Sequence, residues 1–131
     1  MNFIGQCKSK LMQQFGLSEQ QLQAEHLVLD MDGSMLHVEF HQPADCVSAY
    51  CLGNGAGLEE LPLPEQYLLL QRALQTNAEL YERSLLRLYL DEGSFGVVMD
   101  CSPLNCADTD RFMAALQELL SCKELLENPV A

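Results

Sequence analysis

The sequence predicts an α+β fold, in which a five-stranded antiparallel sheet carries three helices in the order α-β-β-β-α-β-β-α. Segments that alternate apolar and polar residues occur first in a run of three and then in a run of two, each joined by short turns. This order is typical of antiparallel sheets and not of alternating strand-helix units. The chain of 131 residues contains no repeat or linker, so residues 1–131 are expected to form one domain.

The first predicted element is an amphipathic helix over residues 2–15. Gly16 follows it as a favourable C-terminal stop, because glycine adopts the left-handed conformation without strain. The apolar residues of this segment recur at helical spacing: Phe3, Ile4, Cys7, Leu11, Met12 and Phe15.

Three strands are expected next, over residues 26–30, 35–41 and 46–52. The first two are joined through Asp32-Gly33, a strong hairpin signal, and the third follows a turn at Gln42-Pro43. The glycine-rich segment 53–57 then reads as a loop. It lacks the Lys and the Ser or Thr of a P-loop and the glycine spacing of a dinucleotide-binding turn.

Pro64 suits the first turn of a second long helix, which is predicted to run to about Leu80. The apolar face of this helix is broad, since it includes Leu68, Leu69, Leu70, Ala73 and Leu74. A helix that is apolar over so much of its circumference needs cover from its own sheet and from a second surface. The pattern therefore indicates a subunit interface.

The final elements are a second hairpin and a third helix. Alternation over residues 83–90 and Phe95–Cys101, joined by the turn Asp91-Glu92-Gly93-Ser94, predicts the hairpin. Asp108 is placed to cap the last helix, which ends before Asn128-Pro129. The buried stripe of that helix is expected to comprise Phe112, Ala115, Leu116, Leu119 and Leu120.

The chain is acidic, with 7 basic residues against 19 acidic ones and a net charge of −12. This charge repels nucleic acid and anionic lipid, so neither is an expected partner. No Lys or Arg occurs between Lys10 and Arg72, which predicts an acidic face; solubility or attraction to a basic partner would both account for it. The chain shows no transmembrane segment and no signal peptide, and a cytoplasmic location is expected.

Metal and catalytic motifs are weak. His37, Glu39 and His41 alternate on one strand and could share an ion, although solvent-facing polar residues on a half-exposed strand account for them more simply. No activated thiol or buried carboxylate pair is apparent, so no enzyme activity and no cofactor are expected. The six cysteines fit buried, reduced thiols better than disulfides or a zinc site: Cys7, Cys46, Cys51, Cys101, Cys106 and Cys122.

The second half of the chain carries a family resemblance. The strand Leu85–Leu90, the turn Asp91-Glu92-Gly93, the strand Phe95–Met99 and the following Ser102-Pro103-Leu104 precede the last amphipathic helix. Together with the first helix, the first hairpin and the leucine-rich helix with Asn77, this pattern resembles the class I chaperones of bacterial type III secretion systems, the Tir-chaperone-like family.

That resemblance implies a small, acidic, cytosolic homodimer without enzymatic activity. Its partners would be one or more secreted effectors, whose N-terminal segment is bound in extended form and kept secretion-competent, with the secretion-system ATPase as a candidate further partner. The broad second long helix and the leucine-rich strand after it cannot both be buried in a monomer of this size, so these residues are expected at the dimer interface: Leu70, Leu74, Leu86, Leu88 and Leu90. Alternatives from other classes are a metal-binding protein and a regulatory adaptor of the same fold.

The effector site is expected where the first helix has more apolar surface than one sheet face can cover. Ordinary core packing is the competing interpretation, because helical stripes of this kind are usually core. The predicted effector contacts are Phe3, Ile4, Cys7, Leu11, Phe15, Leu27, Leu29, Leu36 and Val38.

Overall fold

The computed structural model describes residues 2–31, 34–52, 58–91, 94–106 and 108–122. The helices within these ranges are α1 (Phe3–Phe15), α2 (Glu19–Leu22), α3 (Leu63–Arg83) and α4 (Thr109–Ser121), with short 3-10 turns at η1 (Gln42–Ala44) and η2 (Leu58–Glu60). The strands are β1 (His26–Met31), β2 (Ser34–His41), β3 (Cys46–Leu52), β4 (Leu86–Asp91) and β5 (Ser94–Cys101).

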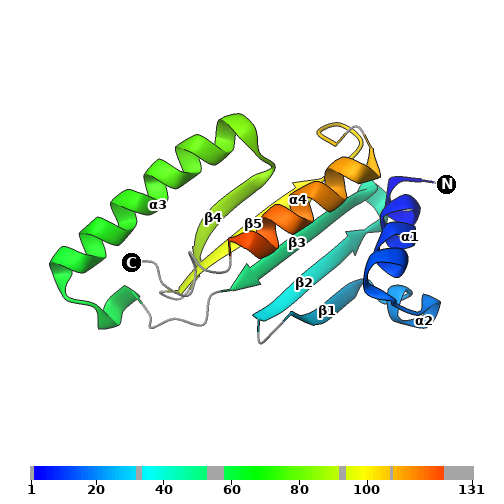
Figure 1. Cartoon of the computed structure of the whole chain (residues 1–131), viewed down its shortest axis with the longest axis horizontal. Helices are drawn as coiled ribbons and strands as arrows, with labels where there is room; N and C mark the ends of the chain where they lie inside the picture. Colours follow the sequence, from blue (N-terminus) through cyan, green and yellow to red (C-terminus); the bar gives the residue numbers. More distant parts are fainter. Residues whose placement is uncertain (1, 32–33, 53–57, 92–93, 107, 123–131) are drawn as a thin grey trace.

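The five strands form one antiparallel sheet in the order β1-β2-β3-β5-β4, so β1 and β4 are its edges (Figure 1). This confirms the predicted fold class and order of the three long helices. The second long helix continues to Arg83, three residues beyond the predicted end at about Leu80. Strand β4 begins at Leu86, three residues after the predicted start at residue 83. The last helix ends at Ser121.

The short helix α2 was not predicted, because four residues are too few to show a hydrophobic period. Its sequence signal is a capping box, in which the Gln21 backbone N–H donates to Ser18 Oγ at 3.2 Å and the Ser18 N–H donates to Gln21 Oε1 at 2.9 Å. The box shields two main-chain donors at the start of the helix and directs Leu22 into the core.

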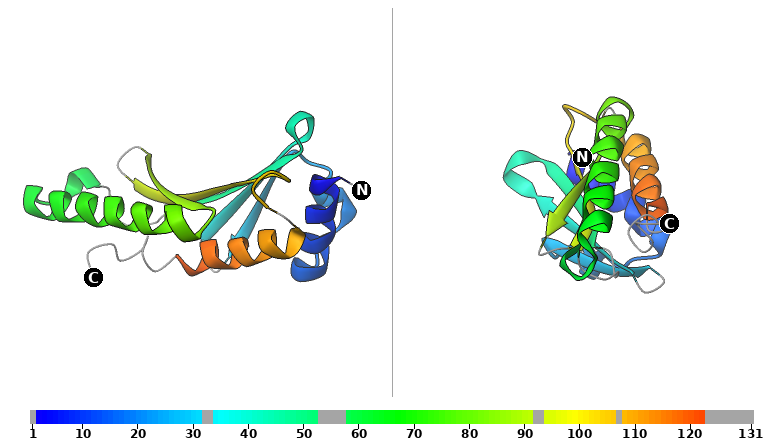
Figure 2. Two further views of the ribbon diagram at one scale, coloured as in Figure 1. Left: turned by 90° about the horizontal axis from the view of Figure 1, so that it is seen from above. Right: turned by 90° about the vertical axis from the view of Figure 1, so that its left-hand side faces the viewer.

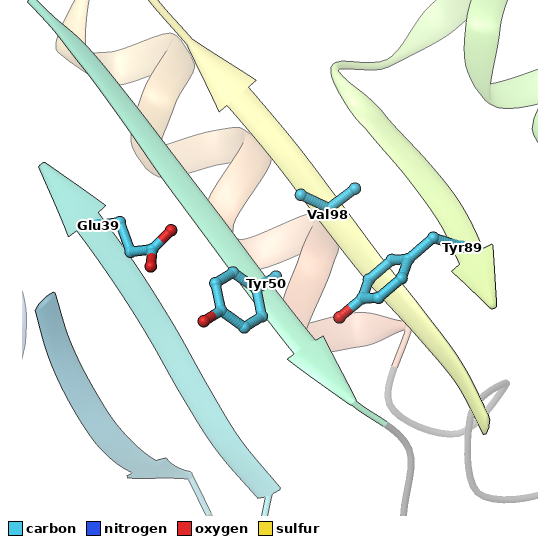
Figure 3. Close-up of a pocket in the computed structure, with 4 residues that line it drawn as sticks. All are labelled: Glu39, Tyr50, Tyr89 and Val98. Carbon is cyan, nitrogen blue, oxygen red and sulfur yellow. The ribbon is translucent and has the colours of Figure 1, made fainter. Parts of the chain in front are cut away.

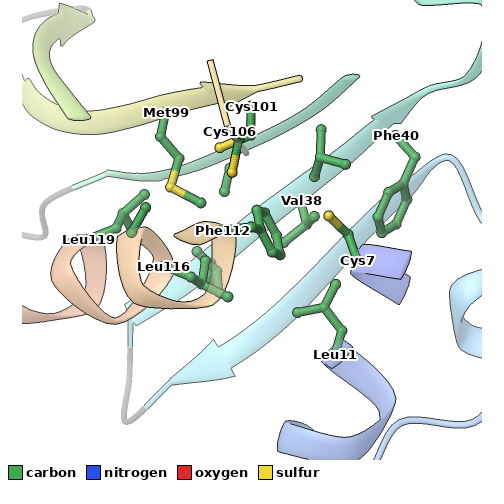
Figure 4. Close-up of a cluster of buried hydrophobic side chains, with 14 of the residues drawn as sticks. Cys7, Leu11, Val38, Phe40, Met99, Cys101, Cys106, Phe112, Leu116 and Leu119 are labelled. Carbon is green, nitrogen blue, oxygen red and sulfur yellow. The ribbon is translucent and has the colours of Figure 1, made fainter. Parts of the chain in front are cut away.

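The core lies between one face of the sheet and the helices α1 and α4, which pack against each other and against β3 (Figure 2). Phe112 and Leu116 of α4 are fully buried, as is Leu11 of α1, and they meet the inward residues of the central strands such as Val38 (Figure 4). Burial of these apolar side chains is the main favourable term in folding. Among the described residues no helix covers the opposite side of the sheet, called here the outer face.

The N-terminus of α1 is joined to the sheet by a charged cap. The backbone N–H groups of Phe3 and Ile4 donate to the two carboxylate oxygens of Asp45 at 3.1 and 3.0 Å, while Asn2 Oδ1 accepts from Gly5. Asp45 adopts a left-handed conformation with φ 50° between η1 and β3, which aims its side chain at the helix end. A carboxylate is favourable there because helix N-termini carry unpaired donors and partial positive charge.

Helix α3 lies against the edge strand β4, away from α1 (Figure 1). As predicted, Pro64 lies in its first turn. Only part of its apolar surface is covered: Leu69 is buried, whereas Leu74 and Tyr81 are each 73% exposed.

Several sequence features fall outside the described residues: the Asp32-Gly33 turn, the loop 53–57, the centre of the second hairpin turn at 92–93, and the Asn128-Pro129 stop. Across the part of the chain that is described, no helix combines the length and the apolar character required to cross a bilayer.

Candidate functional site

The edge strand β1 presents open main-chain groups. The Phe40 N–H donates to the Glu25 carbonyl at 2.8 Å, and β1 pairs with β2 in the same register, with Leu27 opposite Val38. In an antiparallel pair the bonded residues alternate, so Leu27 and Leu29 turn their main-chain groups toward β2. The N–H and C=O groups of His26 and Val28 therefore point away from the sheet, and no described element pairs with them.

The opposite edge, β4, is occupied by side chains at Leu86 and Leu88. The Leu88 N–H donates to Asn77 Oδ1 at 2.7 Å, and Asn77 Nδ2 donates back to the Leu88 carbonyl at 3.1 Å. The Leu86 N–H donates to Ser84 Oγ at 3.1 Å, and the Arg87 guanidinium donates to the Leu86 carbonyl. An additional strand would have to displace these partners at β4, whereas β1 requires no such exchange.

Most of the predicted effector contacts are in the core. Phe3, Ile4, Cys7, Leu11, Leu27, Leu36 and Val38 are each 7% exposed or less. The predicted groove beside the first helix is corrected accordingly: α4 packs against α1 and covers the apolar stripe that had been expected to stay open. Phe15 and Leu29 alone of the predicted set remain half-buried at the surface.

The predicted dimer residues divide into two groups. Leu70, Leu74, Leu88 and Leu90 line one apolar pocket of about 310 Å³ between α3 and β4, together with Ala73 and Phe95. Leu86 is fully buried within the chain and is not available to a partner, because its side chain points into the core beneath β4. Leu74 and Leu90, which are 73% and 48% exposed, are the accessible members of the set.

The strand residues His37, Glu39 and His41 do not converge on a shared point. His37 Nδ1 lies 2.9 Å from Nε2 of His26, and the Nε2 atom of His41 lies 3.1 Å from Ser48 Oγ. Burial, followed by the neighbouring His26, lowers the pKa of His37. Within the described ranges no three His, Cys, Asp or Glu side chains are arranged to hold a metal ion.

All six cysteines are free thiols, as expected from their apolar surroundings. Cys7, Cys101 and Cys106 gather beside Phe112 in the core (Figure 4). Burial and the neighbouring thiols raise the pKa of Cys7 and of Cys101 to about 12, so neither is a nucleophile at neutral pH. The Cys106 thiol, in the segment between β5 and α4, donates to the carbonyl of Asp108, the N-cap of α4, at 3.3 Å.

A second pocket lies on the outer face and was not predicted from the sequence. Glu39, Tyr50, Tyr89 and Val98 come from four different strands and line a pocket of about 340 Å³ (Figure 3). The residues are far apart in the sequence, and only the strand register brings them together. A glycine inside a strand, Gly96 opposite Tyr89, was the available signal, since such a glycine often makes room for a neighbouring ring.

Comparison with solved structures identifies similar folds. A chain in the structure of the HopA1–SchA chaperone–effector complex has a TM-score of 0.67 and 10% sequence identity, and the match covers 96% of this chain and 94% of that one. A chain in the crystal structure of the ExsC–ExsE complex has a TM-score of 0.63 at 14% identity, with 97% and 98% covered. No protein-family model and no curated protein sequence matches. The resemblance to type III secretion chaperones is thus confirmed at the level of the fold.

Proposed function

We propose that this protein is a type III secretion chaperone that binds the N-terminal chaperone-binding segment of a secreted effector in extended form. It would act in the bacterial cytoplasm, keep the effector soluble and secretion-competent, and catalyse no reaction. The support from outside the chain is its fold, which occurs in a chaperone–effector complex. The resemblance also makes the secretion-system ATPase a candidate partner of the loaded complex.

The observation that carries the proposal is the difference between the two edges of the sheet. At β4 the outward main-chain groups of Leu86 and Leu88 are already bonded to side chains, whereas those of His26 and Val28 at β1 pair with no element among the described residues. An extended segment can pair with the open edge through main-chain hydrogen bonds. Main-chain pairing depends little on the sequence of the added strand, which suits a chaperone for an unfolded cargo.

Apolar side chains beside β1 would add to this pairing. An added strand places alternate side chains on the two faces of the sheet. On the inner side they would meet Leu29 and Met31, which are half-buried, and on the outer face they would meet Val28, which is 42% exposed. The cargo contacts proposed here are therefore the β1 edge with Leu29 and Val28, in place of the buried stripe of α1.

We also propose that two copies associate through the apolar pocket between α3 and β4. Leu74 and Leu90 would supply the exposed apolar surface, and the walls of the pocket would receive side chains of the second copy. The β1 edge lies at the other side of the sheet, so the β1 edge of each copy would remain available for cargo.

The test uses Val28→Pro, with Val28→Thr as the matched control. Proline removes an N–H that points away from β2, so the internal ladder is retained, and edge positions tolerate proline for this reason. Threonine keeps the main-chain N–H and has a β-branched side chain of similar size. Tagged versions of each are expressed in the native bacterium, and co-purified proteins are identified by mass spectrometry.

Wild type and Val28→Thr are expected to retain a secreted protein whose N-terminal segment is protease-sensitive alone and protected in the complex. Hydrogen exchange at the amides of His26 and Val28 should slow when cargo is bound, and Val28→Pro should lose the cargo at an unchanged melting temperature. Full cargo retention by Val28→Pro, or protection of a folded partner domain with no slowing at β1, would contradict the proposal.

A further inference from the structure

The pocket on the outer face has two aromatic walls and one charged group. Tyr50 of β3 and Tyr89 of β4 stand on either side of Val98, and the carboxylate of Glu39 on β2 completes the lining (Figure 3). All four residues are half-buried although no described helix covers this face, because the rings lie over the sheet instead of extending into solvent.

Both tyrosine rings are held in place. The Tyr50 ring stacks on the imidazole of His37, with centroids 4.7 Å apart and planes inclined by 3°, and His37 is itself at hydrogen-bonding distance from His26. Tyr89 lies over Gly96 so closely that a Cβ at that position would be 2.5 Å from its Cε1 atom. The pocket walls are therefore formed before any ligand arrives, which reduces the entropic cost of binding.

The pocket holds one carboxylate, that of Glu39. Within the described residues no Lys or Arg forms an ion pair with Glu39. Arg87 shares the outer face, but its guanidinium donates to the Ser84 carbonyl at 3.2 Å and lies 5.0 Å from the Tyr81 ring centroid, at the end of α3. Burial and then the Glu39 carboxylate raise the pKa of the Tyr50 phenol, so this ring stays neutral at physiological pH.

We propose that this pocket binds an arginine side chain presented by a partner polypeptide. A guanidinium is planar, so it can stack on a tyrosine ring while its donors reach the Glu39 carboxylate as a fork. The net charge of −12 attracts a basic segment and repels nucleic acid. The site is separate from the β1 edge and does not rest on the function proposed above.

The proposal is tested by NMR titration of the labelled full chain with N-acetyl-arginine methylamide. The citrulline analogue is the neutral isostere, and the lysine analogue carries the charge without the fork. Saturable shifts confined to Tyr50, Tyr89 and their strand neighbours are expected with the arginine probe, weaker shifts with lysine and none with citrulline. Equal shifts with arginine and citrulline, or shifts spread over acidic residues throughout the chain, would overturn it.

Variants locate the site. Glu39→Gln is expected to weaken binding of the arginine probe about tenfold, because a hydrogen bond between two charged groups is lost. Glu118→Gln, which removes the same charge from the exposed surface of α4, should leave the affinity unchanged. Gly96→Ala should also weaken binding, since its Cβ displaces the Tyr89 wall. If Glu39→Gln and Glu118→Gln bind the probe equally, the assignment of the pocket is wrong.

Discussion

The side-chain amide of Asn77 is bonded to both main-chain groups of Leu88, as acceptor at 2.7 Å and as donor at 3.1 Å. A residue in the middle of α3 thus takes the place that a neighbouring strand would occupy at β4. This contact fixes the helix against the sheet and covers the β4 edge at Leu88, whereas no described element pairs with the outward main-chain groups of His26 and Val28 at β1.

Asn77→Ala should therefore destabilise the fold. The Leu88 N–H and C=O would lose their partners in a partly buried site, which costs about 1–3 kcal/mol. Urea denaturation followed by circular dichroism measures the change. Gln75→Ala on the exposed side of the same helix is the control and should change the free energy of unfolding by less than about 0.5 kcal/mol. Equal stabilities for the two variants would show that the contact contributes nothing.

The Asp45 cap yields a second prediction. Asp45→Gly keeps a residue that tolerates the left-handed conformation at φ 50° but removes both acceptors of the Phe3 and Ile4 N–H groups. The expected loss is about 1–3 kcal/mol of stability, because two main-chain donors lose their acceptors. Asp45→Asn retains one oxygen acceptor and should fall between Asp45→Gly and the wild type. Thermal unfolding of the three proteins checks the order, and a glycine variant as stable as the wild type would refute the cap.

The core thiols predict a loss of stability at alkaline pH. Burial raises the pKa of Cys7 and of Cys101 from 9.0 to about 12. Between these values the unfolded chain loses thiol protons that the folded chain retains, so rising pH favours the unfolded state. The contribution is fully present below about pH 9.0 and declines by about 1.4 kcal/mol per pH unit for each thiol until about pH 12.

Cys7→Ala isolates one of these thiols. Other groups titrate near pH 10, so the variant is compared with the wild type by the slope of the unfolding free energy against pH. Urea denaturation at about pH 8.5, 9.5 and 10.5 gives this slope, because unfolded thiols ionise in that range. The variant should be less stable throughout, because a buried side chain is shortened, but its alkaline slope should be shallower. An unchanged slope would show that Cys7 ionises equally in both states.

The fold was predictable from the sequence because local patterns identify each helix and strand. Leu86 and Leu88 alternate with Arg87, which identifies a strand with one buried face, and Asp108 caps α4 by accepting from the Arg111 N–H at 2.9 Å, as its position indicated. Such signals depend on neighbours a few residues apart. They can be recognised in a single sequence because each element must pair the main-chain groups at its ends and bury its own apolar face.

The surfaces were less predictable because they depend on which elements cover one another. The α1 stripe containing Leu11 looked larger than a sheet could cover, but periodicity does not show that α4 packs against it. The outer pocket joins Glu39, Tyr50 and Tyr89 through three successive strand pairings, and sequence spacing reveals none of them. The broad apolar face of α3 leaves Leu74 exposed in the single chain, and the subunit interface expected there stays a prediction.

The proposed dimer gives the last prediction. Light scattering at micromolar concentration should report twice the chain mass of 14.7 kDa for the wild type. Leu74→Glu should shift the mass to that of one chain, because an unpaired charge in a dry interface costs several kcal/mol.

Leu74 is the informative position because it is 73% exposed in the single chain, whereas Leu88 is 8% exposed and a charge there would disturb the core as well. Leu104→Glu, at a residue that is 98% exposed between β5 and α4, is the matched control and should remain dimeric. A wild-type mass of 14.7 kDa, or a Leu74→Glu variant that stays dimeric, would remove the α3–β4 pocket as the interface.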